Sequence, residues 1–238
     1  MPPKAGKLIV VSTPIGNLED ISIRAINSLK ASDLIACENT KHSSILLNKY
    51  EITSKRISLH KFNEASRIES LIKALDEGKS VAYISDAGTP LISDPGARLV
   101  NKVANANHEI QIIPGPSAVT SAIAGAGLPA DKFFFGGFLS TKKGARSKEL
   151  EQALLREETS VFFESPHRIK STLEILNEKS PERQLVIARE ITKKFEEFIR
   201  GNVEEIKNIF NERTPKGEFV LIISGTKLSK SFSFNTIE

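Results

Sequence analysis

The sequence has few of the residues on which cross-links, metal centres and thiol chemistry depend. Among its 238 residues are one cysteine, four histidines, one methionine and no tryptophan. A single thiol excludes a disulfide framework and thiolate-rich zinc or iron–sulfur sites. The histidines are scattered and form no H-x-x-x-H pair. We therefore predict no metal site.

Long apolar runs are also absent. No stretch approaches the roughly 18 consecutive apolar residues that a membrane-spanning helix requires. The apolar run in MPPKAGKLIVVS is too short for the core of a signal peptide. We expect a cytoplasmic protein of one or two globular domains with no membrane partner. The net charge of +4 is a weak indication of a polyanionic partner such as nucleic acid.

The first half of the chain alternates short apolar runs with amphipathic stretches, which is typical of an α/β domain. Apolar residues three and four positions apart predict the helices, and short apolar runs rich in β-branched residues predict the strands. This alternation implies parallel strands joined by right-handed crossovers. The predicted strands are 8–12, 34–37, 57–60, 81–86 and 110–113, and the predicted helices are 21–31, 43–50, 64–77 and 96–105.

A Pro-Gly-Pro-Ser turn at 114–117 interrupts this pattern, and we place the boundary there, giving domains 1–118 and 119–238. Closely spaced strands in the second domain predict a mixed, partly antiparallel sheet. The final SKSFSFNTIE is predicted to be a frayed tail. The predicted strands are 133–138, 160–164, 184–190, 195–200 and 218–224, and the predicted helices are 117–126, 147–157, 167–178 and 203–212.

Turn-rich segments follow strands of the first domain, and they are the strongest indication of a ligand site. Ligands of open α/β sheets bind at the carboxyl ends of the strands, so we expect these loops to converge. Glycine lets a ligand approach the backbone, and proline fixes the shape of the loop. Asp86 can accept hydrogen bonds from ribose hydroxyls or cap the next helix. The segments are TPIGNL (13–18), SDAGTP (85–90), SDPG (93–96) and PGPSA (114–118).

Cations and phenylalanines cluster at the start of the second domain. Five Lys or Arg residues and no acid lie in 132–148, next to Phe133, Phe134, Phe135 and Phe138. This combination can contact a nucleic-acid backbone and its bases. For the rings we favour burial in a strand, because period-two burial explains them without a ligand. For the cations, phosphate contacts and a solvated loop are equal alternatives.

Seven segments, in order along the chain, carry a family resemblance. They are STPIGNLEDIS (12–22), SDAGTPLISDPG (85–96), PGPSAV (114–119), AGLPADKFFFGGFL (126–139), FFESPHR (162–168), AREITKKFEE (188–197) and KGEFVLII (216–223). Together they resemble the bacterial ribosomal RNA small subunit methyltransferase I family, which has the tetrapyrrole methylase (class III) fold. One departure is Glu38-Asn39-Thr40-Lys41, where that family usually has E-D-T-R.

The resemblance implies a fold, a cofactor and a reaction. The fold is two α/β domains with S-adenosyl-L-methionine bound in the cleft between them, usually in a homodimer. The reaction is 2′-O-methylation of a cytidine ribose in the decoding region of 16S ribosomal RNA, as free RNA or in the assembled 30S subunit. The implied neighbours of the cofactor are Pro14, Ile15, Asp86, Gly88, Thr89, Ser117, Ala118 and Phe163.

A ribose hydroxyl must be aligned behind the methyl carbon and must lose its proton as the new bond forms. The candidate catalytic residues are Glu164, Glu190 and Lys193. Lys193 could be the base if neighbouring cations lower its pKa. The structural alternative is an ion pair between Arg189 and Glu190. The predicted RNA-binding cations are Lys142, Lys143, Arg146, Arg168 and Arg189.

Two other functions stay open on the sequence alone. One is methylation of a tetrapyrrole or another small molecule on the same fold. The other is a non-catalytic RNA-binding factor in ribosome assembly that keeps the cofactor pocket only as structure.

Overall fold

The computed structural model describes residues 6–228, 232 and 234, and the chain divides into two compact units, Met1–Ser117 and Ala118–Glu238. Most of the predicted tail therefore lies outside the described residues. Within the described part of the chain, no helix has the length and apolar character needed to cross a membrane.

The first unit is built on a five-stranded sheet in the order β3-β2-β4-β1-β5, and all its pairings are parallel, as predicted. Its strands are β1 (Lys7–Val11), β2 (Leu34–Cys37), β3 (Lys55–Ser58), β4 (Val81–Ile84) and β5 (Glu109–Ile113). Its helices are the 3-10 turn η1 (Leu18–Asp20), α1 (Ile23–Ala31), α2 (Thr40–Lys49), α3 (Glu64–Asp76) and α4 (Ala97–Asn105).

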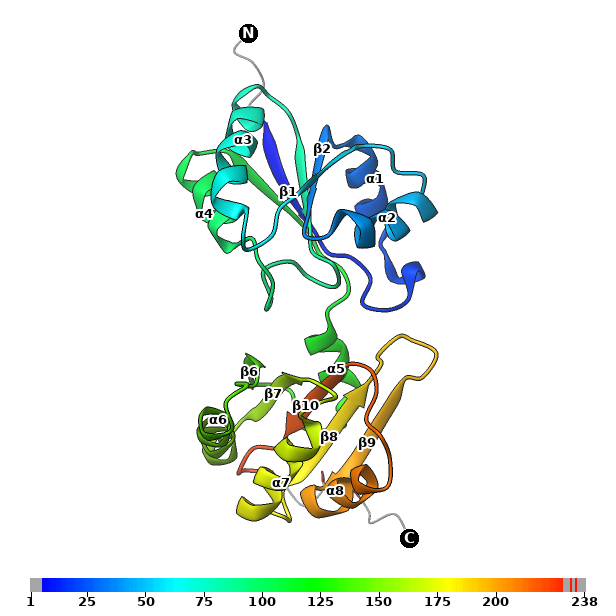
Figure 1. Cartoon of the computed structure of the whole chain (residues 1–238), viewed down its shortest axis with the longest axis vertical. Helices are drawn as coiled ribbons and strands as arrows, with labels where there is room; N and C mark the ends of the chain where they lie inside the picture. The colour runs from blue at the N-terminus through cyan, green and yellow to red at the C-terminus, as the bar shows by residue number, and fades with distance from the viewer. Residues whose placement is uncertain (1–5, 229–231, 233, 235–238) are drawn as a thin grey trace. The chain divides into compact units, whose positions relative to one another are not determined.

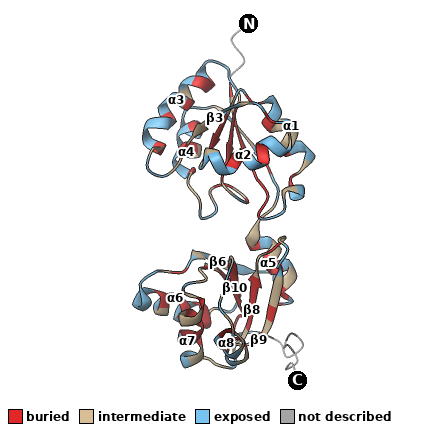
Figure 2. Ribbon diagram, turned by 45° about the vertical axis from the view of Figure 1, so that its right-hand side comes forward, coloured by how far each residue is buried: buried red, intermediate tan, exposed pale blue. Residues whose placement is uncertain are grey.

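Helices cover both faces of this sheet because alternate strand residues point to opposite sides. Ile9 and Val11 pack in one apolar cluster with residues of α1 and α2. Leu8 and Val10 belong to a second cluster with residues of α3 and α4. Figure 1 shows the two helical layers on either side of the sheet, and Figure 2 shows buried strands between helices whose outer faces are exposed. This arrangement leaves the carboxyl edge of the sheet to the loops.

The second unit has a mixed sheet in the order β6-β7-β10-β8-β9, also as predicted. β6 is parallel to β7, and the remaining pairs are antiparallel. Helices α6, α7 and α8 share one apolar core with the sheet, and α5 contacts β8, β9 and β10. The elements are α5 (Ala118–Ala126), β6 (Phe133–Phe138), α6 (Lys143–Leu155), β7 (Thr159–Glu164), α7 (Ile169–Lys179), β8 (Gln184–Arg189), β9 (Glu197–Asn202), α8 (Val203–Asn211) and β10 (Phe219–Ile223).

The burial predicted for the phenylalanines of β6 is wrong. Phe133 and Phe138 are 40% and 60% exposed, and Phe134 is only partly buried against the core. The cause is topological, because β6 is an edge strand with β7 as its single neighbour. A register shift between Phe135 and Phe138 further breaks the expected alternation.

Candidate functional site

Three of the predicted loops meet at the carboxyl edge of the parallel sheet, and hydrogen bonds tie them together. The Ser12 hydroxyl donates to Thr89 Oγ1 at 3.1 Å, and the Thr89 hydroxyl donates to the Pro116 carbonyl at 3.2 Å. Thr13 and Gly88 exchange two backbone hydrogen bonds of 2.9 and 3.0 Å. The loops after β1, β4 and β5 therefore form one connected structure.

Glycine is required where these loops touch. Gly88 has φ of +75°, and a Cβ there would lie 3.3 Å from Ile15 Cγ2. A Cβ at Gly115 would lie 3.0 Å from Ser12 Cβ. Side chains at these positions would push the loops apart, so the absence of a Cβ sets their spacing.

Asp86 connects this group of loops to the neighbouring strand β2. Its Oδ1 accepts a hydrogen bond of 3.1 Å from the backbone N–H of Asn39, which follows β2. The N-cap of α4 is Gly96, so Asp86 does not cap the helix that follows it. Asn39 in turn caps α2, its side chain accepting from the backbone N–H groups of Lys41 and His42. Aspartate and asparagine cap helices about equally well, which accounts for the amide at this position.

The same edge of the sheet concentrates negative charge. Burial raises the pKa of Glu38, and the carboxylates of Asp86 and Asp94 raise it further. Burial also raises the pKa of Asp94, against a hydrogen bond from Ser85 that lowers it. The carboxylates suit a cationic ligand. Glu38 is not among the predicted site residues, although the strand-end rule that selected Asp86 applies equally to the residue after β2.

The first loop contributes to this edge mainly through its backbone, because Pro14 and Ile15 are buried. Ser117 and Ala118 are half-buried and lie where the two units join along the chain. Phe163 is on β7 of the second unit, half-buried between the rings of Phe135 and Phe138 at centroid distances of 5.1 and 5.2 Å. It therefore belongs to a partly exposed aromatic cluster.

Glu164 is fully buried and joins several hydrogen bonds of the second unit. Its carboxylate accepts from the Ser165 N–H at 2.7 Å, Arg168 Nε at 2.9 Å and Thr172 Oγ1 at 2.6 Å. A carboxylate with three internal donors is held in place and shielded from solvent. This geometry favours a structural role over the predicted catalytic one.

The other catalytic candidates lie in the turn between β8 and β9. Lys193 Nζ donates to Glu190 at 2.9 Å and to Glu218 at 2.8 Å. Burial alone would lower the pKa of Lys193, but the hydrogen bonds to the two carboxylates outweigh it and raise the pKa. The pKa of Lys193 is thus shifted in the direction opposite to the lowering that a lysine base would need. Burial would raise the pKa of Glu190, but its bonds to Lys193 and to the Glu218 backbone lower it.

Replacement of Lys193 by arginine should leave unchanged the pH dependence of the methyl transfer that the family resemblance implies. A raised pKa makes the ion pairs stabilising at every pH below the lysine's ordinary value, and the stabilisation is lost only as pH rises through the folded-state value. The neutral amine is therefore scarce at neutral pH. The measurement is a pH–rate profile of Lys193→Arg, with less than about a tenfold loss expected. A loss of roughly a hundredfold or more, typical of removing a general base, would contradict this reading.

The predicted RNA-binding cations fall into three groups, one buried, one exposed and one partly engaged. Arg146 is 4% exposed, and its guanidinium donates to the carbonyls of Ser140 and Thr141 and to the Ser171 hydroxyl. Its guanidinium is buried and bonded within the second unit, so the predicted phosphate contact of Arg146 is wrong. Lys142 and Lys143 are exposed at the start of α6.

Arg168 and Arg189 are both partly engaged within the second unit. Arg168 pairs with Glu164, and its side chain keeps 23% exposure. Arg189 Nε donates to the Lys216 carbonyl at 2.7 Å, and its Nη1 lies 3.6 Å from Glu197 Oε2. The contact with Glu197 replaces the predicted pairing of Arg189 with Glu190.

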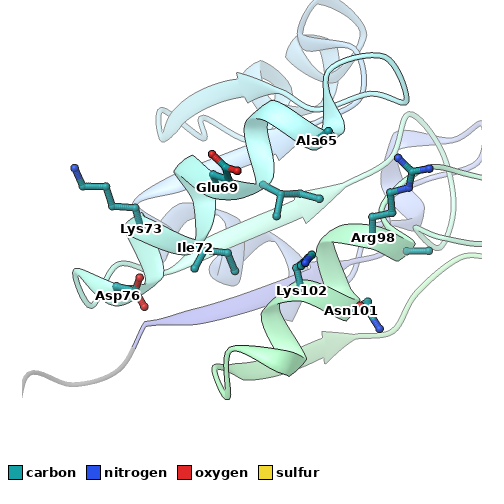
Figure 3. A pocket seen from close by; sticks show the side chains of 10 residues that line it. Ala65, Glu69, Ile72, Lys73, Asp76, Arg98, Asn101 and Lys102 are labelled. Atoms are coloured by element: carbon teal, nitrogen blue, oxygen red, sulfur yellow. The ribbon is translucent and has the colours of Figure 1, made fainter.

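A hollow of about 750 Å³ lies between α3 and α4 (Figure 3). Ala65, Ile68 and Ile72 form its apolar part, and Glu69 and Arg98 are among its charged residues. Side chains of both signs line it, so it has no preference for a ligand of one charge. None of its lining residues comes from the four predicted loops.

Comparison with solved structures identifies the class of the fold. A diphthine synthase superposes with a TM-score of 0.72 at 15% identity, covering 95% of this chain and 92% of that one. A uroporphyrin-III-C-methyltransferase from Thermus thermophilus has a TM-score of 0.63 at 21% identity, covering 91% and 94%. The sequence profile of the Tetrapyrrole (Corrin/Porphyrin) Methylases matches residues 7–207. The fold is thus that of the tetrapyrrole methylases.

Similarity to curated proteins narrows the assignment. The chain is 47% identical over 221 residues to "Ribosomal RNA small subunit methyltransferase I" of Thermotoga maritima, covering 92% of this chain and 99% of the relative. It is 42% identical to the protein of the same name in Bacillus subtilis, covering 93% and 76%. The chain belongs to the ribosomal RNA small subunit methyltransferase I family, within the tetrapyrrole methylases.

The methyl donor of this family is S-adenosyl-L-methionine, and the residues at the sheet edge fit it. The donor carries a positive sulfonium and ribose hydroxyls. Carboxylates at the edge suit the charge, Asp86 can accept from hydroxyls, and the bare backbone at Gly88 admits a close ligand. Pro14, Ile15, Asp86, Gly88 and Thr89 are thus the predicted neighbours that this edge brings together.

Proposed function

We propose that this protein methylates small-subunit ribosomal RNA, and that the acceptor is the 2′-hydroxyl of a cytidine ribose in the decoding region. The observation that carries the proposal is 41–47% identity to proteins named ribosomal RNA small subunit methyltransferase I, over most of the chain. The choice of acceptor rests on the seven sequence segments of the family resemblance.

The cofactor supplies an activated methyl group on its sulfonium. The task of the chain is then to orient a ribose hydroxyl and to hold the RNA. In this proposal the linked loops at Ser12, Thr89 and Pro116 fix the site before binding. Their hydrogen bonds are internal to the first unit, so they do not depend on substrate. A preformed site limits the entropy lost on binding.

The RNA backbone is held, in this proposal, by Lys142 and Lys143, together with Arg168 and Arg189. The lysines are exposed, and the two arginines keep about a quarter of their side-chain surface exposed, at 23% and 24%. Phosphate contacts of this kind position a nucleic acid without reading its sequence. Glu190 and Lys193 then serve to hold the β8–β9 turn in place.

The test is methyl transfer from radiolabelled S-adenosyl-L-methionine to purified 30S subunits and, in parallel, to extracted 16S ribosomal RNA. After nuclease digestion the label should elute as 2′-O-methylcytidine. Label on a base or on protein would overturn the assignment of the acceptor. Labelling of precorrin extracts with RNA untouched would indicate a small-molecule methylase. Calorimetry then measures binding of S-adenosyl-L-methionine. Binding supports an enzyme, and its absence supports an RNA-binding factor that cannot bind the methyl donor.

We also propose that the protein is a homodimer, as the family resemblance implies. Light scattering during gel filtration should then give twice the 26.1 kDa of one chain. A mass of one chain across the working concentrations would contradict it.

A further inference from the structure

Each unit presents an exposed phenylalanine next to a lysine whose ammonium lies over the ring. Phe62 is 86% exposed, and Lys61 Nζ lies 4.8 Å from its ring centroid. Phe195 is 63% exposed, and Lys194 Nζ lies 5.6 Å from its centroid. Removing a large aromatic side chain from water is favourable, so two highly exposed rings with the same neighbour need an explanation.

The loop that carries Phe62 is held in a defined shape. The His60 N–H donates to Asn63 Oδ1 at 2.8 Å, and the Asn63 side-chain amide donates to the Ser58 carbonyl at 3.2 Å. The N–H groups of Asn63 and Glu64 both donate to the His60 carbonyl. The His60 ring lies edge-on to Phe62 at 6.0 Å. The ring is thus held outward by a hydrogen-bonded turn.

This loop lies at the edge of the sheet where the cofactor loops meet. It follows β3, and β3 is parallel to β2, which is parallel to β4. Two strand spacings, about 10 Å, separate β3 from β4. The loop of Phe62 therefore lies at the same edge of the sheet as the loop of Asp86 and Gly88, two strands away from it.

The turn that carries Phe195 is also fixed, at some cost in backbone strain. Glu190 and Thr192 have φ of +50° and +65°, a region that residues other than glycine rarely adopt. Glu196 accepts from the Thr192 N–H at 2.5 Å, and Lys193 bridges Glu190 and Glu218. Strained residues that the surrounding contacts hold in place often mark functional sites.

We propose that Phe62 and Phe195 are stacking platforms for unpaired bases of single-stranded RNA, with Lys61 and Lys194 contacting the adjoining phosphates. This deepens the proposed function and rests on it. An aromatic face takes any base, and a cation beside it adds the backbone contact, which together describe recognition of an unpaired strand. The core of a protein–protein interface is depleted in charged residues, lysine among them, whereas each ring here has a lysine ammonium over it.

The test exploits the absence of tryptophan from the sequence. Phe62→Trp and Phe195→Trp each introduce a single indole, and stacking should quench its fluorescence when a 12-nucleotide RNA without self-complementarity is added. The duplex form of that RNA should quench much less. Ile45→Trp and Leu155→Trp are matched controls, because these residues are 60% and 78% exposed, one in each unit. A tryptophan at position 62 or 195 that RNA leaves unquenched overturns the assignment of that ring.

Affinity for the same oligonucleotide separates stacking from simple apolar contact. Phe62→Ala and Phe62→Leu should both weaken binding by roughly fivefold to a hundredfold, the range for loss of one stacked base, and Phe195 should behave likewise. The salt dependence should stay unchanged, whereas Lys142→Ala should reduce it. A leucine variant that binds as tightly as the original protein would overturn the proposal.

Methyl transfer by the same variants distinguishes this inference from the proposed function. If the original protein methylates 16S ribosomal RNA and the alanine variants bind and methylate RNA normally, the assignment of Phe62 and Phe195 as stacking platforms is wrong and the proposed function stands. If indole quenching occurs but no RNA is methylated under any condition, the platforms stand and the function is wrong.

Discussion

Valine at position 88 should lower the affinity for S-adenosyl-L-methionine by about tenfold to a hundredfold. Gly88 has φ of +75°, and a Cβ at this position would lie 3.3 Å from Ile15 Cγ2. A β-branched residue in that conformation costs on the order of 1–3 kcal/mol, which the loops can relieve only by separating. The paired hydrogen bonds between Thr13 and Gly88 would break first. Titration calorimetry measures the effect directly.

Gly144→Ala is the matched control for this substitution. Nothing lies within 4 Å of a Cβ at Gly144, near the start of α6. Alanine there should leave cofactor affinity unchanged and stabilise the protein by up to about 1 kcal/mol. Unchanged affinity in Gly88→Val would mean that the cofactor does not use the loops linked at this residue.

Removal of the Glu164 carboxylate should destabilise the second unit by about 3–5 kcal/mol, the usual cost of breaking a buried charged pair. Glu164→Ala leaves the Thr172 hydroxyl and Arg168 without their acceptor, and Thr172 is fully buried. Unfolding in urea, followed by circular dichroism, measures the loss. The only tyrosines, Tyr50 and Tyr83, lie in the first unit, so the transition seen by tyrosine fluorescence should move less.

Two further variants separate a structural role from a catalytic one. Glu174→Ala removes an exposed carboxylate from α7, the helix that carries Thr172, and should change stability by less than about 0.5 kcal/mol. Glu164→Gln keeps one acceptor oxygen, and its folded fraction should retain most of the methyl-transfer rate. A loss of a hundredfold or more in folded Glu164→Gln would instead make Glu164 a proton carrier.

The sequence predicted the order and type of the elements well where their residues face a helical layer. β2 and β6 have the predicted limits, and the helix over 64–77 was predicted within one residue. The largest error at a boundary is α6, which begins at Lys143 and not at 147. Its first turn, Lys143-Gly144-Ala145-Arg146, holds no large apolar residue, so apolar periodicity gives no indication of where the helix starts.

β9 shows a different kind of error. Predicted at 195–200, it occupies Glu197–Asn202, because Phe195 belongs to the preceding turn. Phenylalanine is common in strands, so its presence at 195 predicts a strand residue. The hydrogen bonds that hold Phe195 in a turn cannot be inferred from the sequence.

The site was predictable to the extent that it depends on the ends of parallel strands. Glycines and prolines after β1, β4 and β5 indicated loops that do meet. Side-chain partners were not predictable, because they depend on distant segments. The pKa of Lys193 is raised partly by Glu218, which lies 25 residues further along the chain. Arg146 is buried through contacts made across the α6–α7 packing.

The strand order of the first sheet also bears on how the protein is made. β1 is an inner strand whose two neighbours are β4 and β5, so Leu8 can pair only after Val81 and Ile110 have been synthesised. During translation the apolar strand LIVV therefore leaves the ribosome long before either partner exists, while β2 and β3 can already pair with each other. Distant pairings of this kind slow folding and leave apolar segments exposed. Nascent chains stalled before β4 should thus be the ones that bind chaperones most strongly, and chains that extend past β5 should be released.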